Sequence, residues 1–150
     1  MIIAGTESFF LPGNGKKEAV LLLQGFAGNT AELLPLGNFL NAQGYAVLAP
    51  RLPGHGTTAE DMLRTNAEDW LDAVRDAYAV LKGFAQDIVV VGASMGGSLA
   101  LLLAAEKQVK GIVAFTCFHC FHCSGTRHFG SSTQGNANAF RFYARNGTQS

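Results

Sequence analysis

Acidic residues are missing from the last part of this 150-residue chain, because all 11 aspartates and glutamates lie at or before Glu106. Cysteine is missing from the first part. All three cysteines and three of the four histidines follow Thr116: Cys117, Cys120, Cys123, His119, His122 and His128. The chain therefore has two compositions, and we treat residues 1–116 and 117–150 as separate parts.

A strong charge imbalance and long apolar runs are also absent. Eleven basic residues balance 11 acidic ones, so the composition gives no reason to expect a nucleic acid or an anionic membrane as partner. No apolar run approaches the roughly 18 residues of a membrane span, and no charged-then-apolar leader opens the chain. We expect a cytoplasmic protein with a small-molecule partner and no membrane span.

Short apolar runs alternate with helical periodicities along the first part. The runs predict strands at 19–23, 45–49, 88–91 and 111–115, with a first edge strand within 1–10. The periodicities predict helices at 30–43 (starting later than Thr30 because of Pro35) and at 67–84 after a cap at Asn66 or Thr65. Residues 98–106 are apolar almost all round, which predicts a buried helix. This order predicts an α/β protein with a mostly parallel sheet, flanking helices and a site beyond the carboxyl ends of the strands.

The central motif is Gly92-Ala93-Ser94-Met95-Gly96, which lies between a predicted strand and a predicted helix. Gly-x-Ser-x-Gly in that context is typical of a nucleophile elbow, in which a strained turn exposes the serine hydroxyl. Its flanking positions must be small because neighbouring backbone packs against them. The alternative is an ordinary strand–helix turn, since glycine, serine and alanine are common.

Together with three further motifs, this sequence resembles the α/β-hydrolases, and within them the small bacterial carboxylesterases and monoacylglycerol lipases. The resemblance covers residues 18–116. It depends on Leu-Leu-Leu-Gln-Gly-Phe-Ala-Gly-Asn (21–29), Gly-Tyr-Ala-Val-Leu-Ala-Pro-Arg-Leu-Pro-Gly-His-Gly (44–56), Asp69-Trp70 and Val-Gly-Ala-Ser-Met-Gly-Gly (91–97).

The resemblance implies that Ser94 is the catalytic nucleophile in the hydrolysis of small to medium acyl esters, monoacylglycerols among them. It implies that the backbone N–H groups of Phe26 and Met95 form the oxyanion hole, with no cofactor and no metal. The chain departs from the family at Gln24-Gly25, where histidine usually precedes the glycine, and we expect altered packing of that loop. His55 corresponds to a loop residue of the family, so we do not expect it to be the base.

The acid and base of a catalytic triad are the missing parts. In α/β-hydrolases they follow the serine, in the order acid and then histidine. No acidic residue follows Glu106, and no late histidine lies beyond two further strands. We therefore expect a truncated chain that is inactive or very weakly active.

Three interpretations of residues 117–150 remain open. The first, which we favour, is the product of a reading-frame shift, because composition changes abruptly near Thr116. The second is a metal site built from Cys117, His119, Cys120, His122 and Cys123, although these ligands are crowded into seven residues. The third is an irregular low-complexity extension.

A sheet that ends at the predicted strand 111–115 would leave an open edge and an uncovered apolar face. This geometry favours self-association. It also supports a different class of function, in which the chain is a non-catalytic binding module that uses the sheet edge or the Cys/His segment.

Overall fold

The computed structural model describes residues 1–115 and the short strand Phe142–Tyr143. The sequence-based interpretations of residues 117–150, including the Cys/His metal site, otherwise lie outside the described residues. Six strands form one sheet in the order β1-β3-β2-β4-β5-β6. The strands are β1 (Phe9–Leu11), β2 (Glu18–Leu23), β3 (Ala46–Ala49), β4 (Asp87–Ala93), β5 (Gly111–Phe115) and β6 (Phe142–Tyr143).

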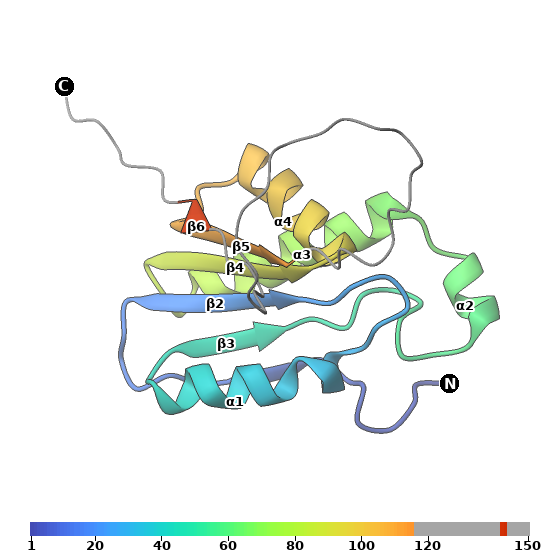
Figure 1. Ribbon diagram of the computed structural model, residues 1–150, viewed down its shortest axis with the longest axis horizontal. Helices are drawn as coiled ribbons and strands as arrows, with labels where there is room; N and C mark the ends of the chain where they lie inside the picture. The colour runs from blue at the N-terminus through green and yellow to red at the C-terminus, as the bar shows by residue number, and fades with distance from the viewer. Residues whose placement is uncertain (116–141, 144–150) are drawn as a thin grey trace, which may run out of the picture.

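The four central strands are parallel, and the two outer strands are antiparallel to their neighbours. The helical segments are η1 (Thr30–Glu32), α1 (Leu34–Ala42), α2 (Ala59–Leu63), α3 (Ala67–Lys82) and α4 (Met95–Glu106). Figure 1 shows that β2, β3, β4 and β5 all point toward the side on which α2 lies. The predicted α/β architecture is therefore confirmed, and the loops after β2, β3 and β4 meet at one edge of the sheet.

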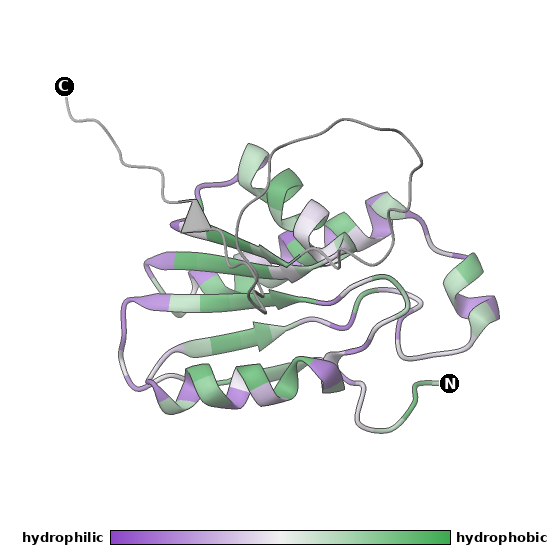
Figure 2. Ribbon diagram, viewed as in Figure 1, coloured by the Kyte–Doolittle hydropathy of each residue, from purple (hydrophilic) through white to green (hydrophobic). Residues whose placement is uncertain are grey.

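Helices cover both faces of β2, which explains why its sequence is apolar without alternation. Ala19, Leu21 and Leu23 pack in one core cluster with residues of α3 and α4. Val20 and Leu22 pack in a second cluster, against Leu36 and Leu40 of α1. Figure 2 shows the strands as hydrophobic through the middle of the sheet. The sheet thereby holds the ends of β2 and β4 rigidly beside each other.

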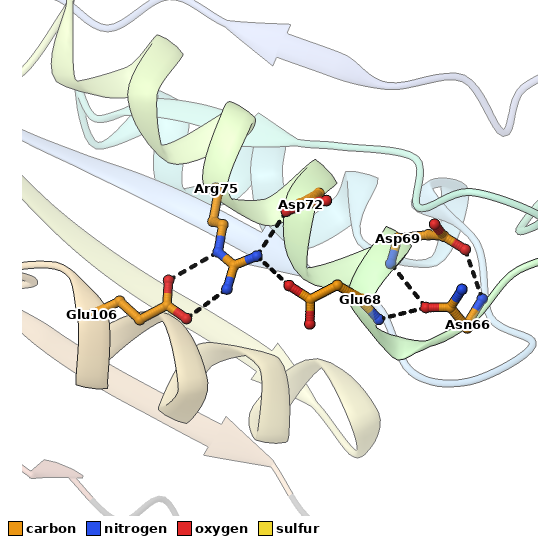
Figure 3. Close-up of polar contacts among 6 residues, drawn as sticks. All are labelled: Asn66, Glu68, Asp69, Asp72, Arg75 and Glu106. Atoms are coloured by element: carbon orange, nitrogen blue, oxygen red, sulfur yellow. Dashed lines mark hydrogen bonds and ion pairs between the residues drawn. The ribbon is translucent and has the colours of Figure 1, made fainter.

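Arg75 of α3 ties that helix to the end of α4 (Figure 3). Its guanidinium donates to both carboxylate oxygens of Glu106, at 2.8 and 2.6 Å. The same side chain bonds Glu68 at 2.6 Å and Asp72 at 2.7 Å. The hydrogen bonds from Arg75 lower the pKa of Glu106, because they favour its ionised form.

Several predicted boundaries need correction. The segment that begins at Thr30 starts as the 3₁₀ turn η1. The helix α1 itself starts at Leu34, with Pro35 in its first turn, so the predicted start later than Thr30 is confirmed. The helix after the elbow begins at Met95 rather than Ser98, so Gly96 and Gly97 belong to its first turn. Helix α2 is not predicted by the sequence, although Thr58 caps it by accepting from the Asp61 N–H.

The prediction of an open edge at β5 is wrong in part. β6 pairs with β5 in antiparallel register, with Ile112 opposite Tyr143 and Val113 opposite Phe142. The apolar face opposite α3 and α4 remains accessible, because Val89 and Val91 are only half-buried and line a groove of about 480 Å³.

Candidate active site

Ser94 lies at the turn between β4 and α4, where the strand ends and the helix begins. Its φ is 50° and its ψ is −115°, a conformation that costs energy for any residue other than glycine. The turn is held from both sides, since the Ser94 N–H donates to the Phe115 carbonyl at 2.7 Å and the Ser94 carbonyl accepts from the Gly97 N–H at 2.9 Å. The residue is exposed, so the strained turn presents its side chain to solvent.

The glycines on either side of Ser94 have no room for a side chain. A Cβ on Gly92 would lie 2.6 Å from the Gly97 nitrogen, and one on Gly96 would lie 2.6 Å from the Gln24 carbonyl oxygen. Both neighbours are backbone atoms, which cannot move aside as a flexible side chain can. The close packing expected at these two positions is therefore present.

The loop after β2 lies directly beside the serine. The Gly28 N–H donates to the Gly25 carbonyl at 3.1 Å, and Ala27 has a φ of 58° while Phe26 does not have a positive φ. These values describe a type II turn over Gly25–Gly28. A Cβ on Gly25 would lie 3.5 Å from the Cβ of Ser94, so the turn and the elbow are in contact.

Two backbone donors near Ser94 are available to a ligand. Among the hydrogen bonds of residues 1–115 and 142–143, none uses the N–H of Phe26 or of Met95. Met95 is the first residue of α4, whose N-terminus also offers the positive end of the helix dipole. An anion at this position would therefore meet two unpaired donors and a favourable field.

An aromatic cluster of Phe26, His55 and Trp70 joins the loop after β2 to its neighbours. The ring centroids of Phe26 and His55 are 6.2 Å apart, those of Phe26 and Trp70 are 6.0 Å apart, and those of His55 and Trp70 are 5.4 Å apart. The Pro53 carbonyl accepts from the Trp70 Nε1–H at 3.0 Å and lies 3.1 Å from His55 Nδ1. The cluster links the loops after β2 and β3 to the first turns of α3.

His55 is fully buried, and burial lowers the pKa of its imidazole. The hydrogen bond to Pro53 places a proton on Nδ1, since a carbonyl can only accept. No hydrogen bond connects His55 to Ser94 within the described part of the chain, and no other histidine falls there. The ring therefore acts in this structure as a neutral packing group.

Gln24 is the position where the chain departs from the family motif. Its side chain is 1% exposed, and neither its oxygen nor its nitrogen has a hydrogen-bond partner among the described residues. Its backbone carbonyl nevertheless lies against Gly96, and the following turn closes normally. The loop therefore forms with glutamine at this position, but the buried amide of Gln24 has no hydrogen-bond partner among the described residues.

Acidic side chains, and the single histidine among the described residues, are scattered over the part of the chain that the structure describes. No group of three or more His, Cys, Asp or Glu side chains gathers there in an arrangement that could hold a metal ion. No helix in residues 1–115 is long and apolar enough to span a membrane.

Comparison with known proteins identifies relatives of this chain. The carboxylesterase of Bacillus subtilis (strain 168) is 45% identical over 101 residues, which cover 66% of this chain and 41% of that protein. The thermostable monoacylglycerol lipase of Bacillus sp. (strain H-257) is 45% identical over 103 residues, covering 69% of this chain and 40% of that protein. The chain therefore spans about two fifths of the length of these relatives.

Solved structures show the same fold. A structure from the work on LipS and LipT, two metagenome-derived lipolytic enzymes, superposes with a TM-score of 0.73 at 26% identity, covering 84% of this chain and 56% of that one. Est1E from Butyrivibrio proteoclasticus, solved with ferulic acid, superposes with a TM-score of 0.58 at 27% identity, covering 71% of this chain and 46% of that one. The sequence profile of the alpha/beta hydrolase family matches residues 10–149. The chain belongs to the alpha/beta hydrolase family.

Proposed function

We propose that this chain carries the nucleophile and the oxyanion hole of a serine carboxylesterase that acts on small to medium acyl esters, monoacylglycerols included. The observation that carries the proposal is the strained, exposed Ser94 with the free N–H groups of Phe26 and Met95 near it. The similarity to a carboxylesterase and a monoacylglycerol lipase of Bacillus supports the choice of esters as substrates.

In the proposed reaction, Ser94 Oγ attacks the carbonyl carbon of the ester and loses its proton. The carbonyl electron pair moves onto oxygen, and the Phe26 and Met95 N–H groups donate to that oxyanion. When the oxyanion collapses, the bond to the alcohol oxygen breaks and the alcohol leaves with a proton. Water then attacks the acyl-Ser94 and releases the carboxylic acid. Preorganised donors favour both tetrahedral states because they need no reorientation.

Proton transfer from Ser94 has no acceptor in place among the described residues. No hydrogen bond of the Ser94 hydroxyl occurs within residues 1–115 and 142–143, so no base is in place to activate it there. Serine without a base is a poor nucleophile. The proposal therefore assigns the 150-residue chain only the residual catalysis of an oxyanion hole and substrate binding, roughly 10³-fold over water.

The test is hydrolysis of p-nitrophenyl butyrate, with and without added imidazole as an external base. We expect slow hydrolysis by the wild-type chain that imidazole accelerates, after the rate of the Ser94→Ala variant is subtracted. Ser98→Ala, an exposed serine one turn along α4, should behave as wild type. Equal rates for wild type and Ser94→Ala under all conditions would contradict the proposal.

A second proposal is that the chain associates with a second copy of itself through its apolar sheet face. The groove of about 480 Å³ between α1 and β5 supports it, because apolar side chains such as Val89 and Val91 line the groove. Sedimentation equilibrium should detect a concentration-dependent dimer that Val91→Lys weakens. A monomer at all concentrations would contradict it.

A further inference from the structure

An asparagine followed directly by glycine lies in the link between β1 and β2, at Asn14 and Gly15. Both residues are exposed. Gly15 has a φ of 93°, a backbone conformation that other residues rarely adopt, and a Cβ there would meet no atom within 4 Å. The peptide nitrogen of Gly15 is therefore accessible on the side where the Asn14 side chain begins.

The residues before Gly15 are held against the turn between α1 and β3. The Asn14 N–H donates to the Gly44 carbonyl at 3.1 Å. A Cβ on Gly13 would lie 2.6 Å from the Ala46 nitrogen, so the two segments pack backbone against backbone. We call this contact, between residues 13–14 and 44–46, the turn contact. It fixes the backbone of Asn14 and leaves the next residue unconstrained.

The carboxamide of Asn14 belongs to the turn contact but makes no hydrogen bond. A Cβ on Gly44 would lie 2.9 Å from Asn14 Cγ, so the carboxamide packs directly on that glycine. Among the residues that the structure describes, neither the Asn14 side chain nor the Gly15 N–H has a hydrogen-bond partner. An attack of the Gly15 nitrogen on Asn14 Cγ would therefore break no existing hydrogen bond of either group.

The other asparagines within residues 1–115 are in more protected places. The side chains of Asn29 and Asn66 accept from backbone N–H groups at the starts of η1 and α3. The side chain of Asn41 donates to two backbone carbonyls, at 2.7 and 3.0 Å. Asn38 lies inside α1, where the N–H of the following residue takes part in helical hydrogen bonding. In this part of the chain, the free carboxamide and the free following N–H occur together at Asn14.

We propose that Asn14 is a site of spontaneous covalent modification, at which the amide is converted to aspartate and isoaspartate. Hydroxide removes the proton from the Gly15 nitrogen, which attacks Asn14 Cγ. The bond from Cγ to Nδ2 breaks, and ammonia leaves with a proton from water. Water then opens the cyclic imide. Cleavage between Cγ and the Gly15 nitrogen gives aspartate, whereas cleavage between that nitrogen and the main-chain carbonyl carbon of residue 14 gives isoaspartate.

Isoaspartate at position 14 should release the turn contact. The main chain of isoaspartate runs through Cβ and Cγ, so the link between β1 and β2 becomes one atom longer. The carbon that packs on Gly44 becomes part of the backbone, and a carboxylate takes the place of the original main-chain carbonyl. The modification therefore loosens the edge strand β1, which pairs with β3 on one side.

The test follows the modification in the full chain during incubation in mildly alkaline buffer. Trypsin releases the peptide of residues 1–16, in which Asn14 is the single asparagine. Chromatography with mass spectrometry separates its asparagine, aspartate and isoaspartate forms. We expect the folded chain to convert Asn14 at a rate within about tenfold of the isolated peptide of residues 1–16, because no hydrogen bond has to break first. A slower rate than this in the folded chain would overturn the proposal.

A second measurement tests the effect on the turn contact. Asn14→Gln is the matched control, because its longer side chain does not form the cyclic imide readily and every other asparagine of the chain is retained. If Asn14→Gln does not fold, Asn14→Ser serves instead. Incubation should lower the urea concentration at the midpoint of unfolding more for wild type than for the variant. Equal decreases in the two proteins would overturn the link between the modification and the turn contact.

Discussion

The carbonyl oxygen of Gln24 lies 2.6 Å from the point that a Cβ on Gly96 would occupy, so the loop after β2 and the first turn of α4 touch backbone to backbone. This contact sets the distance between the two proposed oxyanion donors. It also explains why the motif needs glycine two residues after Ser94.

Replacing Gly96 by alanine should therefore destabilise the protein by about 3 kcal/mol, since a methyl group forced against backbone costs more than ordinary overpacking. Gly111→Ala is the matched control, because a Cβ there has no neighbour within 4 Å. It should be neutral or slightly stabilising. Urea unfolding of both variants measures the difference, and equal stability would mean that the two segments do not pack as described.

Phe26 allows the backbone donor to be removed without removing the turn. It occupies the second position of the type II turn over Gly25–Gly28, where proline is well tolerated. Phe26→Pro should lower Ser94-dependent hydrolysis by about 10²- to 10³-fold, because proline has no N–H. Phe26→Ala keeps the N–H and should have a much smaller effect on kcat. Equal losses in the two variants would assign the effect to the ring instead.

Acid should destabilise the protein through His55. Burial lowers its pKa from the ordinary value of 6.5, so the unfolded state binds a proton more readily than the folded state. The resulting stability is present above pH 6.5 and is lost as the pH falls toward the lowered pKa of the folded state. As the pH is lowered from 6.5, the urea concentration at the midpoint of unfolding should decrease in wild type. His55→Gln should remove that decrease. An unchanged pH dependence in the variant would contradict the assignment.

The link between α3 and α4 should respond at lower pH. Arg75→Met removes the hydrogen bonds to Glu106, Glu68 and Asp72, and we expect a lower Tm at neutral pH. The pKa of Glu106 is lowered from its ordinary value of 4.5, so this stabilisation exists above pH 4.5 and disappears as the pH falls below it. Thermal unfolding should therefore give different Tm values for the two proteins at pH 7 and similar values at the acid end.

Asn66 offers a simpler test of local structure. Its side chain accepts from the N–H groups of Glu68 and Asp69, and the Asp69 carboxylate accepts from the Asn66 N–H (Figure 3). Asn66→Ala should cost about 1 kcal/mol, whereas Asn66→Gly should cost only a few tenths. Urea unfolding distinguishes the two variants, and a large loss with glycine would show that the side chain does more than cap α3.

Sequence patterns predict the parallel core because each central strand is apolar, α3 has a clear helical period and α4 is apolar on nearly all sides. They place the elbow correctly for a physical reason, since only glycine fits at positions 92 and 96. They miss α2, whose five residues include none that is buried, so that it has no apolar period to detect. A cavity of about 450 Å³ next to Phe26 is missed with it, because its walls come from the N-terminal segment, the turn after β2 and the segment that contains α2.

Sequence patterns also do not predict the start of α4 at Met95 or the pairing of β6 with β5. Glycine at 96 and 97 argues against a helix locally, yet packing of the first turn against β2 and β5 outweighs that preference. β6 has only two residues, and its pairing with β5 depends on backbone hydrogen bonding rather than on an alternating pattern.

Capture of the acyl group on Ser94 would identify this residue as the nucleophile, and peptide mass spectrometry detects that capture. The chain is incubated with p-nitrophenyl butyrate, quenched in acid, and digested to locate any acyl group. We expect a single butyryl group on the peptide that contains Ser94 and none in the Ser94→Ala variant. Butyryl groups on other residues only, at the same level in both proteins, would contradict it.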